Sequence, residues 1–93
     1  MTYRVVISGV AEKDLRRIRD RTALRRLSEA IEALADDPHP PHAGKLRGVD
    51  NIWRIRVGAW RICYSIEAGR LIVLVLTVAR RREVYERLRR RLD

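Results

Sequence analysis

The 93-residue sequence contains no phenylalanine, one cysteine, three prolines and two histidines. A single cysteine, Cys63, cannot form a disulfide within the chain. The longest clearly apolar run, Leu71–Leu76, is far shorter than the ~20 residues that a membrane-spanning helix needs. Nothing near the first residues combines a basic flank with a long apolar stretch, as a signal peptide would. We therefore expect a cytoplasmic protein with no membrane association.

Acidic residues are also scarce relative to basic ones: 12 against 21, for a formal net charge of +9 and a pI of 11.1. Residues 1–44 hold eight bases and seven acids, whereas residues 45–93 hold thirteen bases and five acids. This imbalance predicts a polyanionic partner, nucleic acid first, that contacts the second half. The 46% hydrophobic content excludes a disordered basic tail. The length predicts one domain over residues 1–93.

Hydrophobic periodicity predicts an α+β fold with the element order βααβββα. A helical stripe of apolar residues in the first half predicts an αα-hairpin, and three closely spaced prolines predict a loop after it. We expect a small antiparallel sheet with the αα-hairpin and a C-terminal helix. The predicted segments are a strand at 2–8, helices at 11–20 and 22–35, a loop at 36–42, strands at 52–57, 60–66 and 71–78, and a helix at 80–93.

A two-residue turn at Gly58-Ala59 would fix the register of the strands on either side of it. In that register one face carries only apolar residues and must be the core side. Its pairs are Val57 with Trp60, Ile55 with Ile62, and Trp53 with Tyr64.

The opposite face of this hairpin carries Arg54, Arg56 and Arg61, with Arg56 directly opposite Arg61. Like charges that face each other across strands are destabilising by up to ~1 kcal/mol, so the cluster implies an anion that binds there. The alternative is a solvated sheet face whose arginines have no ligand.

A second turn around Ala68-Gly69 predicts that Leu76 lies opposite Arg61 and Leu74 opposite Cys63. The arginines would then be bordered by an apolar ridge, which a helix or a partner must cover.

The last segment has apolar residues at helical spacing, with Arg81 and Tyr85 one turn apart on nearly the same side. Tyr85 is equally compatible with a place in the core, and the arginines around it with a solvated tail. His39 and His42 fit solvated loop histidines better than a metal site, because the sequence offers no third histidine.

Five segments in this order resemble the RelE/ParE superfamily of toxin–antitoxin toxins, on the RelE-like side. They are Lys45-Leu46-Arg47-Gly48, Trp53-Arg54-Ile55-Arg56, Trp60-Arg61-Ile62-Cys63-Tyr64, Arg80-Arg81 and Glu83-Val84-Tyr85. The resemblance covers nearly the whole chain, and the fold of the family matches the element order given above.

The resemblance implies a ribosome-dependent endoribonuclease that needs no cofactor and no metal. Such toxins cleave mRNA in the ribosomal A site by attack of a ribose 2′-hydroxyl on the adjacent phosphate. By motif position, Arg61, Arg81 and Tyr85 would be catalytic. The residues that would bind RNA phosphates are Arg54, Arg56, Lys45, Arg47 and Arg80.

The sequence departs from the family at the strand pair, where well-known members have lysine and this chain has Arg54 and Arg56. A guanidinium cannot act as a base at neutral pH, so these two can only bind phosphate and stabilise charge. Tyr85 is then the remaining candidate for the base, since neighbouring cations lower a phenol pKa.

The resemblance also implies partners: an acidic antitoxin, the ribosome with bound mRNA, and operator DNA contacted through the antitoxin. Two other functions stay open. One is a ParE-like toxin that inhibits DNA gyrase, and the other is a non-catalytic basic module that binds nucleic acid.

Overall fold

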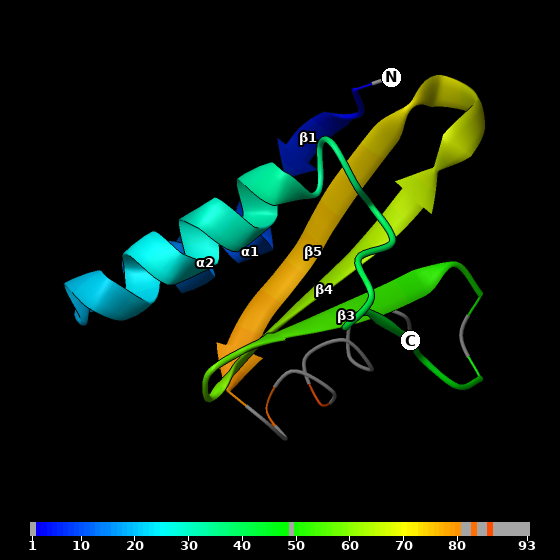
Figure 1. Cartoon of the computed structure of the whole chain (residues 1–93). Coiled ribbons are helices and arrows are strands. Elements are labelled where there is room, and N and C mark those ends of the chain that lie inside the picture. Colours follow the sequence, from blue (N-terminus) through cyan, green and yellow to red (C-terminus); the bar gives the residue numbers. More distant parts are fainter. Residues whose placement is uncertain (1, 49, 81–82, 84–85, 87–93) are drawn as a thin grey trace.

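A computed structural model describes residues 2–48, 50–80, 83 and 86, and its sheet has five strands with two helices on one side (Figure 1). None of the helices in these described ranges is long and apolar enough to cross a membrane. The elements are β1 (Arg4–Ile7), α1 (Gly9–Arg16), α2 (Arg21–Ala33), β2 (Gly44–Lys45), β3 (Ile52–Val57), β4 (Trp60–Glu67), the 3₁₀ turn η1 (Ala68–Arg70) and β5 (Ile72–Arg80).

The strand order is β1-β5-β4-β3-β2, which confirms the α+β class. The sheet is mixed, because β1 pairs with β5 in parallel while the other neighbours are antiparallel. A wholly antiparallel sheet was therefore a wrong expectation at this one edge. The two-residue strand β2 is an addition to the predicted order. Of the predicted helix at 80–93, Glu83 and Glu86 are described and helical, and the other residues beyond 80 lie outside the described part.

Both helices begin at side-chain caps. The Ser8 hydroxyl accepts a hydrogen bond from the Ala11 amide at 3.1 Å, and the Asp20 carboxylate accepts from Thr22 and Ala23 at 3.0 and 3.2 Å. Such caps satisfy amides that the first helical turn leaves without partners. The predicted apolar stripe of the second helix is confirmed as buried or half-buried, and it packs in the main core: Leu24, Leu27, Ile31 and Leu34.

The register predicted for the first hairpin is confirmed at every pair. Gly58 has a φ of 60°, in the left-handed region that glycine adopts without strain, so the two-residue turn forms. The side chains of this hairpin that face α1 and α2 belong to the main hydrophobic core. They are Trp53, Ile55, Val57, Trp60, Ile62 and Tyr64.

The register predicted for β4 and β5 is wrong. The connection is the η1 turn followed by Leu71, whose φ of 54° is left-handed, so the first pair is Glu67 with Ile72. A bulge between the pairs of Cys63 and Tyr64 then shifts the register by one more residue. As a result Arg61 lies opposite Ala79, and Leu76 falls at the bulge, between the pairs Tyr64–Val75 and Cys63–Thr77.

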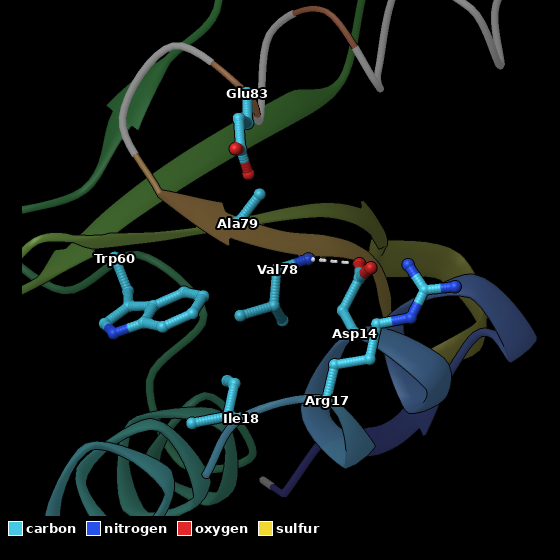
Figure 2. Close-up of a pocket in the computed structure, with 7 residues that line it drawn as sticks. All are labelled: Asp14, Arg17, Ile18, Trp60, Val78, Ala79 and Glu83. Atoms are coloured by element: carbon cyan, nitrogen blue, oxygen red, sulfur yellow. Dashed lines mark hydrogen bonds between the residues drawn. The ribbon is translucent and has the colours of Figure 1, made fainter. Parts of the chain in front are cut away.

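A buried carboxylate joins α1 to the bulged part of β5 (Figure 2). Asp14 is 5% exposed, and its Oδ2 accepts hydrogen bonds from the Thr77 hydroxyl at 2.9 Å and the Val78 amide at 3.0 Å. The pairing of β1 with β5 ends at Ile7 and Val75, so backbone groups of β5 beyond Val75 need other partners on that side. Asp14 supplies one and fixes the last residues of β5 relative to the helices.

Replacement of Asp14 should therefore destabilise the protein strongly. Asp14→Ala leaves the Thr77 hydroxyl and the Val78 amide buried without their acceptor, and we expect a loss of about 2–4 kcal/mol in the free energy of unfolding. Glu12→Ala on the same helix removes only the exposed ion pair to Arg16 and should cost less than about 1 kcal/mol. Urea denaturation of both variants measures the difference, and equal losses would contradict this role of Asp14.

Candidate nucleic-acid interface

Arg54, Arg56 and Arg61 lie on the sheet face opposite α1 and α2, and we call this surface the arginine face. In β3 and β4 they alternate with the residues that pack against the helices. Arg56 is paired directly with Arg61, and Arg54 with Cys63. The structure thus brings together on one face the three arginines that the sequence predicts there.

The three arginine side chains have different surroundings. Arg61 Nη1 donates to the carbonyl oxygens of Trp60 at 3.0 Å and Gly58 at 3.3 Å, which directs this side chain toward the hairpin turn. Arg54 extends toward the neighbouring strand β2, while Arg56 is exposed. These hydrogen bonds place the Arg61 guanidinium beside two carbonyl oxygens, whose partial negative charge offsets part of the repulsion expected from its pairing with Arg56.

A second, smaller hydrophobic cluster lies beside the arginines. Its buried members are Ile52, Cys63 and Ala79, with Leu46 and Leu76 packed against them, and no residue of α1 or α2 belongs to it. An apolar group including Leu76 thus borders the arginine face, although the register differs from the predicted one. Leu74 lies opposite Ser65, away from the position predicted for it.

Three other predicted phosphate-binding residues lie elsewhere. Lys45 is paired with Trp53, and Arg80 with Trp60, so both alternate onto the helix side of the sheet. The Arg80 guanidinium carbon is 5.0 Å from the centre of the Trp60 ring, within cation–π range. Arg47 is exposed in the loop after β2. Arg81 and Tyr85 lie outside the described residues.

The charges of the arginine face have no acidic partners in the described part of the chain. The ion pairs found there are Arg16 with Glu12 and Arg70 with Glu67, both exposed and within four residues in sequence. Because folding does not neutralise the cluster, its positive field remains available to an anion.

The loop at 36–42 is held by two contacts that sequence reasoning missed. The Tyr64 hydroxyl donates to the Pro38 carbonyl at 2.9 Å, and the exposed His39 ring meets the Trp53 ring edge-on at 4.7 Å. Tyr64 is buried, and this burial, together with the Asp37 carboxylate, raises its pKa to about 12. Among the described residues no group of three or more histidine, cysteine or acidic side chains could hold a metal ion.

The sequence profile of a family described as "ParE toxin of type II toxin-antitoxin system, parDE" matches residues 5–85. This chain belongs to that toxin family. The toxin is 28% identical over 89 residues to a Methanocaldococcus jannaschii protein that bears the name toxin RelE1, with 92% of this chain and 98% of that protein covered. The superfamily that the sequence segments resemble is thus confirmed.

Solved structures agree with the fold of the toxin. The archaeal RelE–RelB complex of Pyrococcus horikoshii matches with a TM-score of 0.77 and 29% identity, covering 88% of this chain and 98% of that one. The toxin–antitoxin complex RelBE2 of Mycobacterium tuberculosis matches with a TM-score of 0.74 and 26% identity, covering 87% and 100%. The family profile carries the ParE name and these relatives carry the RelE name, so membership alone leaves the target of the toxin open.

The stability of the toxin should fall steeply at alkaline pH because of Cys63. Burial raises the pKa of this thiol from 9.0 to about 12, an effect that the Arg54 guanidinium partly offsets. Above pH 9 the unfolded chain releases the thiol proton while the folded chain keeps it, so the free energy of unfolding decreases until pH reaches about 12.

Thermal melts across this range should show a shallower decrease for Cys63→Ala than for the parent. Tyr64 contributes its own decrease above pH 10 in both proteins and serves as the internal reference. Parallel pH profiles for the two proteins would contradict a buried, protonated thiol.

Proposed function

We propose that this toxin is a ribosome-dependent mRNA endoribonuclease that cleaves in the A site and inhibits translation. The observation that carries the proposal is the arginine face, where three guanidinium groups lie on two paired strands with no acidic partner among the residues that the structure describes. A surface of this kind suits a phosphodiester whose charge increases during cleavage.

The proposed chemistry is attack by a ribose 2′-oxygen on the adjacent phosphorus, with release of the 5′-oxygen of the next nucleotide. Arg61 holds a non-bridging phosphate oxygen, and Arg54 and Arg56 bind neighbouring phosphates. Tyr85 accepts the proton of the 2′-hydroxyl, and Arg81 or water supplies one to the leaving oxygen. A site of this composition is weak on free RNA, so it depends on the ribosome to align the reacting groups.

The RNA contacts proposed for Lys45, Arg47 and Arg80 lie outside the arginine face. We place them as contacts to flanking phosphates of mRNA or to ribosomal RNA. Their positions around the sheet suit a partner larger than a single strand.

We further propose that an acidic antitoxin covers the arginine face and the smaller hydrophobic cluster. Two solved relatives were crystallised as complexes with antitoxins of the RelB type. The combination of arginines with Leu46 and Leu76 suits an amphipathic, acidic segment. In the toxin–antitoxin complex, the antitoxin would be the component that binds operator DNA.

The deciding experiment is induction of the toxin in cells, followed by mapping of RNA 5′ ends. Cleavage restricted to translated copies of a message, and absent from the same message without a start codon, is the expected result. Arrested DNA replication without RNA cleavage would identify a gyrase inhibitor and overturn the proposal. Absence of both effects would identify a binding module.

Arg61→Ala should lower A-site cleavage by ~10²–10³-fold, because a donor to the transition-state phosphate is lost. The slope of log affinity for single-stranded RNA against log salt should fall by roughly 0.7 for the lost contact. Folding should change by less than about 1 kcal/mol, since the carbonyls of the turn can bind water instead.

The matched control is Arg25→Ala, which also removes one positive charge, but from an exposed position on α2, on the other side of the sheet. It should retain both the cleavage rate and the salt slope. Equal behaviour of the two variants would mean that only net charge matters.

Tyr85→Phe should lower cleavage by ~10²–10⁴-fold, the usual range for loss of a general base, while the variant still binds ribosomes. Single-turnover cleavage on programmed ribosomes separates the two effects. Cleavage at the parental rate would assign Tyr85 to packing alone.

A further inference from the structure

Gly44 and Arg54 face each other across β2 and β3. A β-carbon built on Gly44 would lie 2.8 Å from Arg54 Nη2, 3.6 Å from its guanidinium carbon and 4.0 Å from Nε. Side-chain carbons are not found at the shortest of these distances from a nitrogen. The Arg54 guanidinium therefore occupies the space that any residue larger than glycine would fill.

Packing, and not a hydrogen bond from Nε, holds this end of Arg54 in place. Its Nε is buried and has no hydrogen-bond partner among the described residues. The same face carries Leu46, two residues beyond Gly44, and Ile52 of β3, both in the smaller hydrophobic cluster. The side chain is thus confined between an apolar cluster and the bare backbone of β2.

Backbone conformation gives no separate reason for glycine at this position. Gly48 and Gly58 have positive φ angles, but Gly44 does not, so alanine can adopt the Gly44 backbone. Alanine also loses less conformational entropy than glycine when a strand forms. The cost of a β-carbon falls on the flexible end of Arg54, which must move away.

We infer that Gly44 is a positioning residue for Arg54: the absence of its side chain sets the direction in which the Arg54 guanidinium presents its N–H groups. The inference rests on the proposed role of Arg54 in binding phosphate. Recognition of phosphate by a guanidinium depends on the orientation of its planar fork, so a displaced fork binds less well at unchanged charge.

The test compares Gly44→Ala, Arg54→Ala and the double variant in binding of a short single-stranded RNA. Gly44→Ala should melt at or slightly above the parental temperature. It should lose part of the RNA affinity that Arg54→Ala loses, because the charge remains while its orientation changes, and the double variant should lose no more than Arg54→Ala alone. Gly69→Ala is the matched control, because its β-carbon meets nothing within 4 Å and should change neither quantity.

Nitrogen-15 spectra of the arginine Nε–H groups give a readout that does not depend on RNA. The buried Nε–H of Arg54, assigned by its absence in Arg54→Ala, should shift or broaden in Gly44→Ala and stay unchanged in Gly69→Ala.

An unchanged Arg54 signal in Gly44→Ala, unfolding of that variant, or additive losses in the double variant would each overturn the inference. If the signal shifts but Arg54→Ala binds RNA like the parent, the positioning of Arg54 stands. That result would instead overturn the proposed phosphate contact.

Discussion

The register of the β3–β4 hairpin is the constraint on which the rest of the structure depends. Side chains alternate between the two faces of a strand, so a slip of one residue would exchange every residue of one face for the other. In the observed register, apolar residues pack against the helices and the arginines lie on the opposite face. The left-handed Gly58 permits the short turn that selects this register. The same turn therefore determines both which side chains enter the core and which face of the sheet carries the arginines.

A second constraint acts at the far end of β5. The pairing of β1 with β5 ends at Val75, and beyond it the Asp14 carboxylate on α1 accepts a hydrogen bond from the Val78 amide. The helices are thereby attached to the part of the sheet that leads into Arg80. The hydrogen bonds of Asp14 thus hold α1 against the core side of the sheet, and the arginine face lies on the other side.

Local chemistry made much of this architecture predictable from sequence. Helical stripes, prolines and a two-residue turn act between residues that are close in the chain, and the helices and the first hairpin followed from them. The β4–β5 register failed because the turn is longer than two residues and a bulge adds another. The parallel partner of β1 could not be predicted, because nothing near Arg4 specifies Ile72.

The candidate site divides in the same way. Periodicity placed Arg54, Arg56 and Arg61 on one face, since facing depends only on alternation. Periodicity could not predict where a guanidinium lies. That of Arg61 depends on a hydrogen bond to the Gly58 carbonyl, and that of Arg54 on the space left beside Gly44. Lys45 and Arg80 were grouped with the arginines through the family resemblance, and alternation assigns them to the helix side.

The topology also determines when this toxin can fold. β5 lies between β1 and β4, so the first strand of the chain finds its hydrogen-bonding partner only after residue 72 has been made. Until then a growing chain contains the two amphipathic helices and the β3–β4 hairpin, but not β5, which joins β1 to β4. Contacts of such long sequence separation form late and slowly. The arginine face therefore reaches its final packing only after β5, the strand that pairs with β4, has been synthesised.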